Sequence, residues 1–353
     1  MALLEFTDKG IYCRQAEVYL DPWKPVKHAI ISHGHSDHAT YGHQSYLCSK
    51  GTEPIIRHRL RLVNNVEAMP YGEERVIHGV KFSFHPAGHI PGSAQIRVEY
   101  KGEVWVFSGD YKRELDNISE PFEPLRCHTF ITESTFGLPV YNWKPQSEVM
   151  NDINAWWRKN QSEGKVSVIT GYTLGKSQRI IKNIDPSIGK IMTHGAVEVM
   201  NQVLKTNGLE LPFTERVTKE MKKQDFEGAL IVCPPSAVGS TWIRKFLPFS
   251  LGIASGWMLL RGPRRRKGAD RGFVLSDHAD WNDLNTTVKE TGAEKVFATH
   301  GYAELYAQWL TENGIEAHEG KTQYEGELGE LVESGESSDA VEAEAGENVT
   351  NVD

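Results

Sequence analysis

Three histidines and one aspartate fall within six residues, directly after a β-like run at residues 27–31. They are His33, His35, Asp37 and His38. Imidazole and carboxylate groups suit zinc, iron or manganese ions. A catalytic zinc ion keeps one position open for water, so it does not need four ligands from a single turn. The block therefore predicts two metal ions side by side, in a hydrolase.

The spacing of the block divides it between the two ions. His33 and His35 alternate with small residues, so both side chains can point the same way from the end of a strand. Asp37 and His38 follow on the next turn and point elsewhere. We therefore expect one ion on the first pair and the other ion on the second pair.

Three residues far along the chain can complete the two sites. His89 follows a glycine turn and suits the first, and His300 follows a strand-like run and suits the second. Asp110 comes after a strand and Gly109, and its two oxygens can bridge both ions. Bound metal lowers the pKa of water toward ~7, and two ions ~3.5–4 Å apart can clamp a phosphodiester. Six of the other histidines lack such context and are interpreted as non-ligands: His43, His58, His78, His128, His194 and His318.

The elements that must position these groups are strands whose ends carry them. Apolar or alternating runs at 81–85, 103–108, 129–132 and 295–299 end on or just before a candidate residue. Lys101-Gly102 separates two such runs and predicts a hairpin with a tight turn. A rigid sheet that presents catalytic groups from its strand ends and loops explains this pattern.

A second α/β unit is predicted downstream of this set. A helical pattern at 146–163 is followed by a β-branched run at 165–170, and helical and strand-like runs then alternate to about residue 260. Lys176 and Arg179 open one of these helices, where they could contact phosphate or serve a structural role. With 353 residues the chain is long enough for two domains.

Composition narrows the class of protein. The chain has no apolar run near the ~20 residues of a membrane span, and its N-terminus does not resemble a secretory signal. Four scattered cysteines predict reduced thiols in a cytoplasmic protein. The net charge of −8 comes from the end of the chain, because residues 322–353 hold ten acidic and no basic side chains. We expect an acidic, disordered tail over 326–353.

The motifs resemble those of the metallo-β-lactamase superfamily, and the match covers the seven predicted ligands in the family's order: His33, His35, Asp37, His38, His89, Asp110 and His300. More specifically, the chain resembles the β-CASP nucleases. Glu133-Ser-Thr-Phe-Gly137 resembles their acidic motif A, Ser276-Asp-His278 the motif B histidine, and Gly171–Gln178 the segment that opens the inserted β-CASP domain. Length and ending are most similar to the bacterial DNA ligase-associated exonuclease family.

This resemblance implies an α/β fold, a four-layer αββα sandwich with an inserted α/β domain. It places the first part of the metallo-β-lactamase domain at 1–138, the inserted β-CASP-like domain at 139–272 and the return segment at 273–325. It also implies two divalent cofactor ions, zinc or manganese, and a DNA ligase and a helicase as possible partners. It leaves the oligomeric state open.

The resemblance also assigns catalytic roles. Asp37 belongs to the catalytic set as a metal ligand, and His278 would protonate the leaving oxygen as general acid. Glu133 would orient His278 or a ligand histidine.

An arginine-rich run just before His278 predicts the substrate. Arginine pairs well with phosphate, and neutralising the backbone dominates affinity for nucleic acid. The candidate substrate-binding residues are Arg261, Arg264, Arg265, Arg266, Lys267 and Arg271. A plain solvated loop is the alternative interpretation.

The predicted function is a two-metal exonuclease that acts on DNA in repair. An RNA-processing nuclease is the nearest alternative, because RNA-acting β-CASP enzymes tend to carry histidine where this chain has His300. A scaffold that has lost its ligands is disfavoured, since all seven are present. A small-molecule hydrolase such as a lactonase would not need the insertion or the arginine run.

Overall fold

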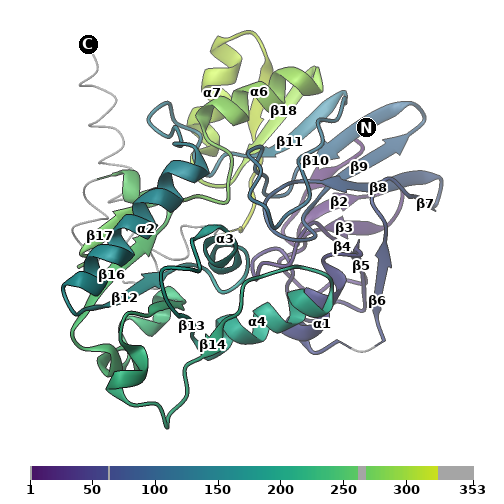
Figure 1. Ribbon diagram of the computed structural model, residues 1–353. Helices are drawn as coiled ribbons and strands as arrows, with labels where there is room; N and C mark the ends of the chain where they lie inside the picture. Colours follow the sequence, from purple (N-terminus) through teal and green to yellow (C-terminus); the bar gives the residue numbers. More distant parts are fainter. Residues whose placement is uncertain (1, 63, 261–267, 325–353) are drawn as a thin grey trace. The chain divides into compact units, whose positions relative to one another are not determined.

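The computed structural model describes residues 2–62, 64–260 and 268–324 (Figure 1). Five of the predicted substrate-binding residues, Arg261, Arg264, Arg265, Arg266 and Lys267, and the acidic tail at 326–353 lie outside these ranges. The chain divides into two compact units. The first comprises the chain up to Leu115, Ser119–Tyr141 and the stretch that begins at His278, and the second comprises Asp116–Ile118 and Asn142–Asp277.

The first unit contains two sheets. The smaller one has six strands in sequence order, of which the first three pair antiparallel and the last four parallel. Its strands are β1 (Glu5–Phe6), β2 (Ile11–Cys13), β3 (Val18–Leu20), β4 (His28–Ile31), β5 (Ser45–Ser49) and β6 (Val66–Met69).

The larger sheet has seven strands in the order β19-β18-β11-β10-β9-β8-β7. Strands β10, β11, β18 and β19 run parallel, whereas β7 to β10 form an antiparallel meander. The bounds are β7 (Glu74–Ile77), β8 (Val80–Pro86), β9 (Ala94–Tyr100), β10 (Glu103–Phe107), β11 (Thr129–Glu133), β18 (Lys295–Thr299) and β19 (Glu316–Glu319). The predicted hairpin is present, and both Lys101 and Gly102 have positive φ, as a type I′ turn requires.

Apolar side chains pack on both faces of each sheet in this unit. One core joins the two sheets, with Ile11 and Leu20 on one side and Phe82 and Ile96 on the other. A second core packs helices α6 (Trp281–Thr291) and α7 (Ala303–Glu312) on the larger sheet, and Figure 1 shows both helices beside β18. A third core packs α1 (Glu53–Leu60) on the smaller sheet. The resulting framework is mixed α/β, and it holds the strand ends in fixed positions.

The second unit is built on one fully parallel sheet, with strand order β14-β13-β15-β12-β16-β17. Its strands are β12 (Val166–Thr170), β13 (Ile191–Thr193), β14 (Glu215–Arg216), β15 (Leu230–Cys233), β16 (Phe249–Ala254) and β17 (Arg271–Phe273). Its helices are α2 (Gln146–Ser162), α3 (Lys176–Asn183) and α4 (Gly195–Thr206), with short 3-10 turns at Lys223–Phe226, Pro235–Ala237, Thr241–Phe246 and Gly256–Leu259. Trp156 and Trp157 of α2 pack with Ile180 and Ile181 of α3 in its core. The second α/β unit expected from the sequence is therefore present.

In the described part of the chain, we find no helix with the length and apolar character needed to cross a lipid bilayer.

Candidate metal centre

The ends of five strands bring the predicted ligands and Glu133 together. Because β10, β11 and β18 run parallel, Asp110, Glu133 and His300 come from the same edge of the larger sheet. Strand β8 runs in the same direction as β10, since each pairs antiparallel with β9, so His89 follows at this edge too. The smaller sheet joins this edge where the backbone N–H of Ala94 donates to the carbonyl of Ser32, directly before the histidine block that follows β4.

The ligand-type atoms form two adjoining groups. In each group one atom of every residue lies within 4.8 Å of the others. The first group consists of His33, His35, His89 and Asp110, and the second of Asp37, His38 and His300. The structure thus brings all seven predicted ligands together, with Asp110 in the first group, and His33 and His38 form a further compact group with Asp21.

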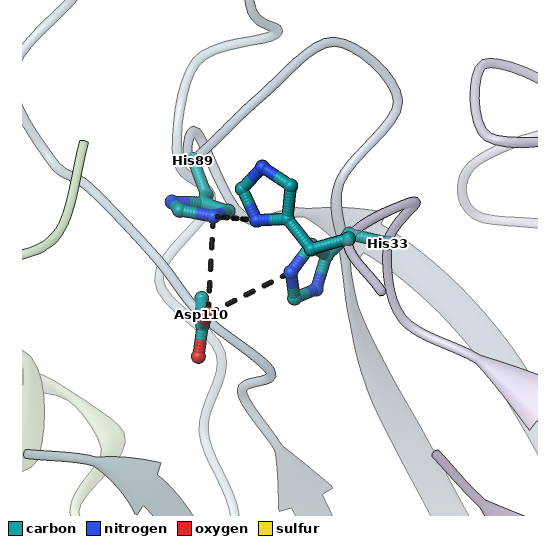
Figure 2. Close-up of side chains that lie close together, drawn as sticks. His33, His89 and Asp110 are labelled. Carbon is teal, nitrogen blue, oxygen red and sulfur yellow. Dashed lines mark hydrogen bonds and ion pairs between the residues drawn. The ribbon is translucent and has the colours of Figure 1, made fainter. Parts of the chain in front are cut away.

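Asp110 faces both groups, and its Oδ2 lies 3.5 Å from Nε2 of His38 in the second group. Oδ2 lies 3.6 Å from Nε2 of His33 and 3.8 Å from Nε2 of His89. In Figure 2 these two rings and the carboxylate point toward one another. Oδ1 lies 3.6 Å from Nε2 of His300 in the second group. A carboxylate in this position can hold an ion on each side.

The backbone at this edge is tight. Gly109 has a φ of +56°, and a Cβ on it would lie 2.8 Å from the side chain of Ser32. His300 also has a positive φ of +62°, which is uncommon for a residue with a side chain. Such conformations persist where the surrounding structure imposes them and cluster at functional sites.

Buried hydrogen bonds fix the rings of the second group. Nδ1 of His38 lies 2.7 Å from Oδ2 of Asp21, and because a carboxylate oxygen only accepts, Nδ1 donates. The remaining nitrogen, Nε2, lies 3.2 Å from Nε2 of His300, and it presents a lone pair to a metal ion once the ring is neutral. Nδ1 of His300 is held by the hydroxyl of Thr299 at 3.0 Å. Outer partners of this kind set the tautomer and orientation of metal-binding histidines.

Tyr324 covers the same two rings. Its ring stacks on His38 and on His300, with centroids 4.3 and 4.7 Å apart, and its hydroxyl donates to the backbone carbonyl of Asp21 at 2.9 Å. The second group is therefore closed on one side by an aromatic ring and tied to Asp21 on another.

The first group has other neighbours. Nδ1 of His33 lies 3.0 Å from the hydroxyl of Ser32, and Nε2 of His89 lies 3.1 Å from Nδ1 of His35. His35 is partly exposed, whereas His33 and His89 are buried.

Burial and crowded charge shift the pKa values of these groups in opposite directions. Burial lowers the pKa of His33 and of His300 well below 6.5, which keeps both imidazoles neutral. Burial would also lower the pKa of His38, but the carboxylates of Asp110, Asp37 and Asp21 outweigh it and raise the value to about 10. Burial raises the pKa of Asp110 to about 7, although His38 acts in the opposite sense. The carboxylates that stabilise a positive charge on His38 can also stabilise a bound metal cation.

The residues present fit divalent metal ions. Imidazole nitrogens and carboxylate oxygens are ligands that suit zinc and manganese. Nε2 of His33 and Oδ1 of Asp110 are buried and make no hydrogen bond within the described residues. Buried polar atoms are normally satisfied, so an ion is the natural partner for both.

Glu133 and His278 meet beside the first group, as the resemblance implies. Oε2 of Glu133 accepts from Nδ1 of His278 at 2.8 Å, and Oε1 accepts from the backbone N–H of Tyr111 at 2.7 Å. The ring of His278 lies 4.7 Å from that of His89, and Asp110, Glu133 and His278 form a further compact group. Glu133 thus contacts His278 directly and can orient it.

Of the predicted substrate-binding residues, only Arg271 lies within the described ranges. It is exposed, its guanidinium lies 3.8 Å from Asp152, and it sits over the ring of Phe273. Nothing in these contacts places it at the metal centre.

Two residues of the metal centre are absent from the sequence-based prediction. Asp21 follows strand β3 directly, which is the same strand-end pattern that pointed to Asp110, so the sequence carried a signal for it. Tyr324 follows the last strand after a short polar stretch, and no motif marks it.

Comparison with known proteins points to one group of enzymes. A probable DNA ligase from Opitutus terrae is 33% identical over 311 residues, which is 87% of this chain and 30% of that protein. An RNase J-like protein from Methanocaldococcus jannaschii is 29% identical over 183 residues, covering 45% of this chain and 43% of that protein. The cleavage and polyadenylation specificity factor 73 of Drosophila melanogaster is 27% identical over 125 residues, covering 35% of this chain and 18% of that protein.

The fold also occurs in a solved structure. A crystal structure of a protein of unknown function from Enterococcus faecalis V583 matches with a TM-score of 0.61 and 12% identity, over 83% of this chain and 80% of that one. No protein-family model matches the chain.

The chain spans less than half the length of each of these curated relatives. The relatives nevertheless include β-CASP nucleases. The chain belongs to the β-CASP branch of the metallo-β-lactamase superfamily.

Proposed function

We propose that the protein is a metal-dependent nuclease that hydrolyses phosphodiester bonds, and that its substrate is DNA, which it degrades as an exonuclease in repair. The observation that carries this proposal is the position of Asp110 between two groups of buried ligands, with His278 and Glu133 alongside. The two groups would hold two divalent ions, zinc or manganese. One ion would lie on His33, His35 and His89, and the other on Asp37, His38 and His300. When bound, they would supply an acidified water and positive charge at the phosphate.

The protein's own groups account for the proton transfer. Because Nδ1 of His278 donates to Glu133, the proton for the leaving group must come from Nε2. As the phosphorus–oxygen bond to the leaving group breaks, that oxygen takes the proton and His278 becomes neutral. Glu133 stabilises the protonated ring beforehand through its negative charge.

The architecture supports the family's fold in more detail. Helix α1, the two sheets of the first unit, and helices α6 and α7 form successive packed layers, which we infer to be the αββα sandwich. We infer that the second unit is the inserted β-CASP-like domain. Its boundaries in the structure, Tyr141–Asn142 and Asp277–His278, fall a few residues later than the predicted 139 and 272.

RNA is the second candidate substrate, and a specific observation favours it. Two of the relatives are named as RNA-directed proteins, an RNase J-like protein and the endoribonuclease YSH1 of Saccharomyces cerevisiae. The relative from Opitutus terrae, matched over 311 residues, is instead named a probable DNA ligase, which supports DNA as the substrate and a ligase as a partner. A helicase partner and a cytoplasmic location stay predictions.

The test is a cleavage assay on matched substrates. The full chain would be incubated with manganese or zinc and end-labelled single- and double-stranded DNA and RNA of the same sequence, beside an Asp110→Asn variant. We expect metal-dependent shortening of DNA from one end, which the variant lacks. Faster cleavage of RNA would establish the second candidate, and no cleavage of any substrate would reject both.

A further inference from the structure

Helix α3 carries two cations that the proposed mechanism does not use. Lys176 and Arg179 could contact phosphate according to the sequence, but a phosphate site must be accessible. In the structure both side chains are buried, at 0% and 2% exposure, and both face Asp277, which is 3% exposed. All three residues belong to the second unit.

The contacts of Arg179 fix a short piece of backbone. Its Nη1 donates to the carbonyl oxygen of Ser276 and to Oδ1 of Asp277 at 3.1 Å, while Nε donates to the side chain of Gln146. Nζ of Lys176 lies 3.8 Å from the other carboxylate oxygen, Oδ2. A planar guanidinium holds two acceptors in one fixed geometry, which a flexible ammonium group cannot do.

The next residue in the chain is His278. After it, the backbone N–H of Ala279 donates to the carbonyl of Tyr111 at 2.7 Å, and the N–H of Tyr111 donates to Glu133. The backbone before His278 is therefore held by Arg179 within the second unit, and the backbone after it is held by Tyr111 within the first unit.

We propose that Arg179, together with Lys176, is a positioning residue that sets the location of the His278 ring by anchoring Ser276 and Asp277. This inference rests on the proposed function, in which His278 protonates the leaving oxygen. General acid catalysis needs donor and acceptor within about 2.6–3.2 Å. A displacement of about 1 Å can lower a rate on the order of 100-fold.

A merely structural role for the buried ion pair is the competing interpretation, because removing one partner from such a pair is strongly destabilising. The leaving group distinguishes the two. When a nucleotide hydroxyl leaves, its oxygen takes a proton from Nε2 of His278. A p-nitrophenolate leaves as a stable anion without that proton, although here too the phosphorus–oxygen bond to the leaving group breaks.

The experiment compares two substrates in each variant of the full chain with manganese: an end-labelled DNA oligonucleotide and thymidine 5′-(p-nitrophenyl) phosphate. Arg179→Lys keeps the positive charge but loses the planar guanidinium that holds its acceptors in one fixed geometry. We expect it to slow oligonucleotide cleavage about 10-fold, a part of the 10²–10⁴-fold of a general acid, and to change nitrophenyl ester cleavage less than about 2-fold. His278→Ala should show the same selectivity, with an oligonucleotide loss of about 100-fold or more.

The matched control is Arg158→Lys. Arg158 makes an exposed ion pair with Asp185 at 2.7 Å in the same unit, remote in sequence from His278, and its replacement should leave both rates unchanged. Because one folded fraction cleaves both substrates, the ratio of the two rates does not depend on how much of a variant is folded.

Asp277→Asn provides a second variant for the same anchor. It should reproduce the selective loss, and combining it with Arg179→Lys should add little, since the two residues act through one contact. An equal loss on both substrates from Arg179→Lys, no loss at all, or an additive double variant would overturn the inference while leaving the nuclease assignment intact. A wild-type chain that cleaves neither DNA nor RNA would reject the proposed function, and the inference with it.

Discussion

The two groups of candidate metal ligands are arranged in different ways. In the first group the rings of His33, His35 and His89 meet nearly at right angles, with interplanar angles of 81–84°. In the second group the rings of His38 and His300 lie nearly parallel, at 16°, and Tyr324 stacks on both at 14°.

The difference lies in what holds each group before an ion arrives. In the second group, a carboxylate and an aromatic ring fix the histidines from outside. In the first group, His33 contacts the hydroxyl of Ser32, and His89 contacts His35, which is partly exposed. Preorganised ligands lose less freedom on binding, so we expect the second group to bind its ion more tightly. Four predictions test this comparison.

The largest effect should follow from Asp110→Asn, because Asp110 faces both groups. The variant keeps the shape of the side chain but removes its charge. We expect both ions to be lost and DNA cleavage to fall by at least about 100-fold, beyond the 10–100-fold typical of outer partners. Metal content by mass spectrometry and the cleavage assay measure the two losses.

Asp152→Asn is the control for that charge change, since Asp152 is exposed and pairs only weakly with Arg271 in the second unit. It should retain both ions. If Asp110→Asn retained two ions at full affinity, the central position of Asp110 would have no functional meaning.

Asp21→Asn should separate the two groups. The amide can still accept from the backbone N–H of Ser32, but its nitrogen cannot accept from His38. We expect one of two dissociation constants to rise about 10–100-fold and the other to change little. Competition with a chromogenic chelator resolves the two constants, and an equal change in both would contradict the comparison.

A smaller effect should follow from replacing Tyr324. Aromatic pairs contribute about 0.5–1.5 kcal/mol, so Tyr324→Leu should weaken the second site roughly 2–12-fold. Tyr324→Phe is the matched variant, since it keeps the stack on His38 and His300 and loses only the hydrogen bond to Asp21. If the phenylalanine variant bound metal as weakly as the leucine variant, stacking would not be the cause.

The smallest effect on metal binding is expected at His43, a buried histidine five positions after His38. Burial lowers the pKa of His43 to about 4, with no carboxylate opposing it, in contrast to His38. Its Nδ1 accepts from the backbone N–H of Val26, a bond that protonation would break. His43→Gln should change either metal affinity less than about 2-fold.

The role of His43 should instead appear in the pH dependence of stability. Below pH 6.5 the unfolded chain takes up a proton on His43 that the folded chain refuses until about pH 4. The free energy of unfolding should therefore fall as the pH is lowered between these values, by an amount on the order of 2–3 kcal/mol. Urea titrations should show that His43→Gln removes this part of the slope. An unchanged slope in His43→Gln would contradict this role of His43.

Much of the metal centre could be predicted from local sequence. The alternation in the histidine block, the strand ends before Asp110 and His300, and the turn at Lys101-Gly102 all depend on neighbours in the chain. The same holds for the helices that begin at Gln146 and Lys176. In each of these cases a few adjacent residues determine the backbone, so their pattern is sufficient.

The tertiary structure alone decided which side chains support those ligands. Tyr324 reaches the carbonyl of Asp21 across 303 positions of sequence, and Arg179 reaches Asp277 across 98. The sequence determined which ligand-type residues gather at this edge of the sheet and which elements carry them. It could not show that Lys176 and Arg179 turn inward or that Tyr324 covers the second site. Such contacts depend on how whole layers pack, and no short stretch of the chain encodes that packing.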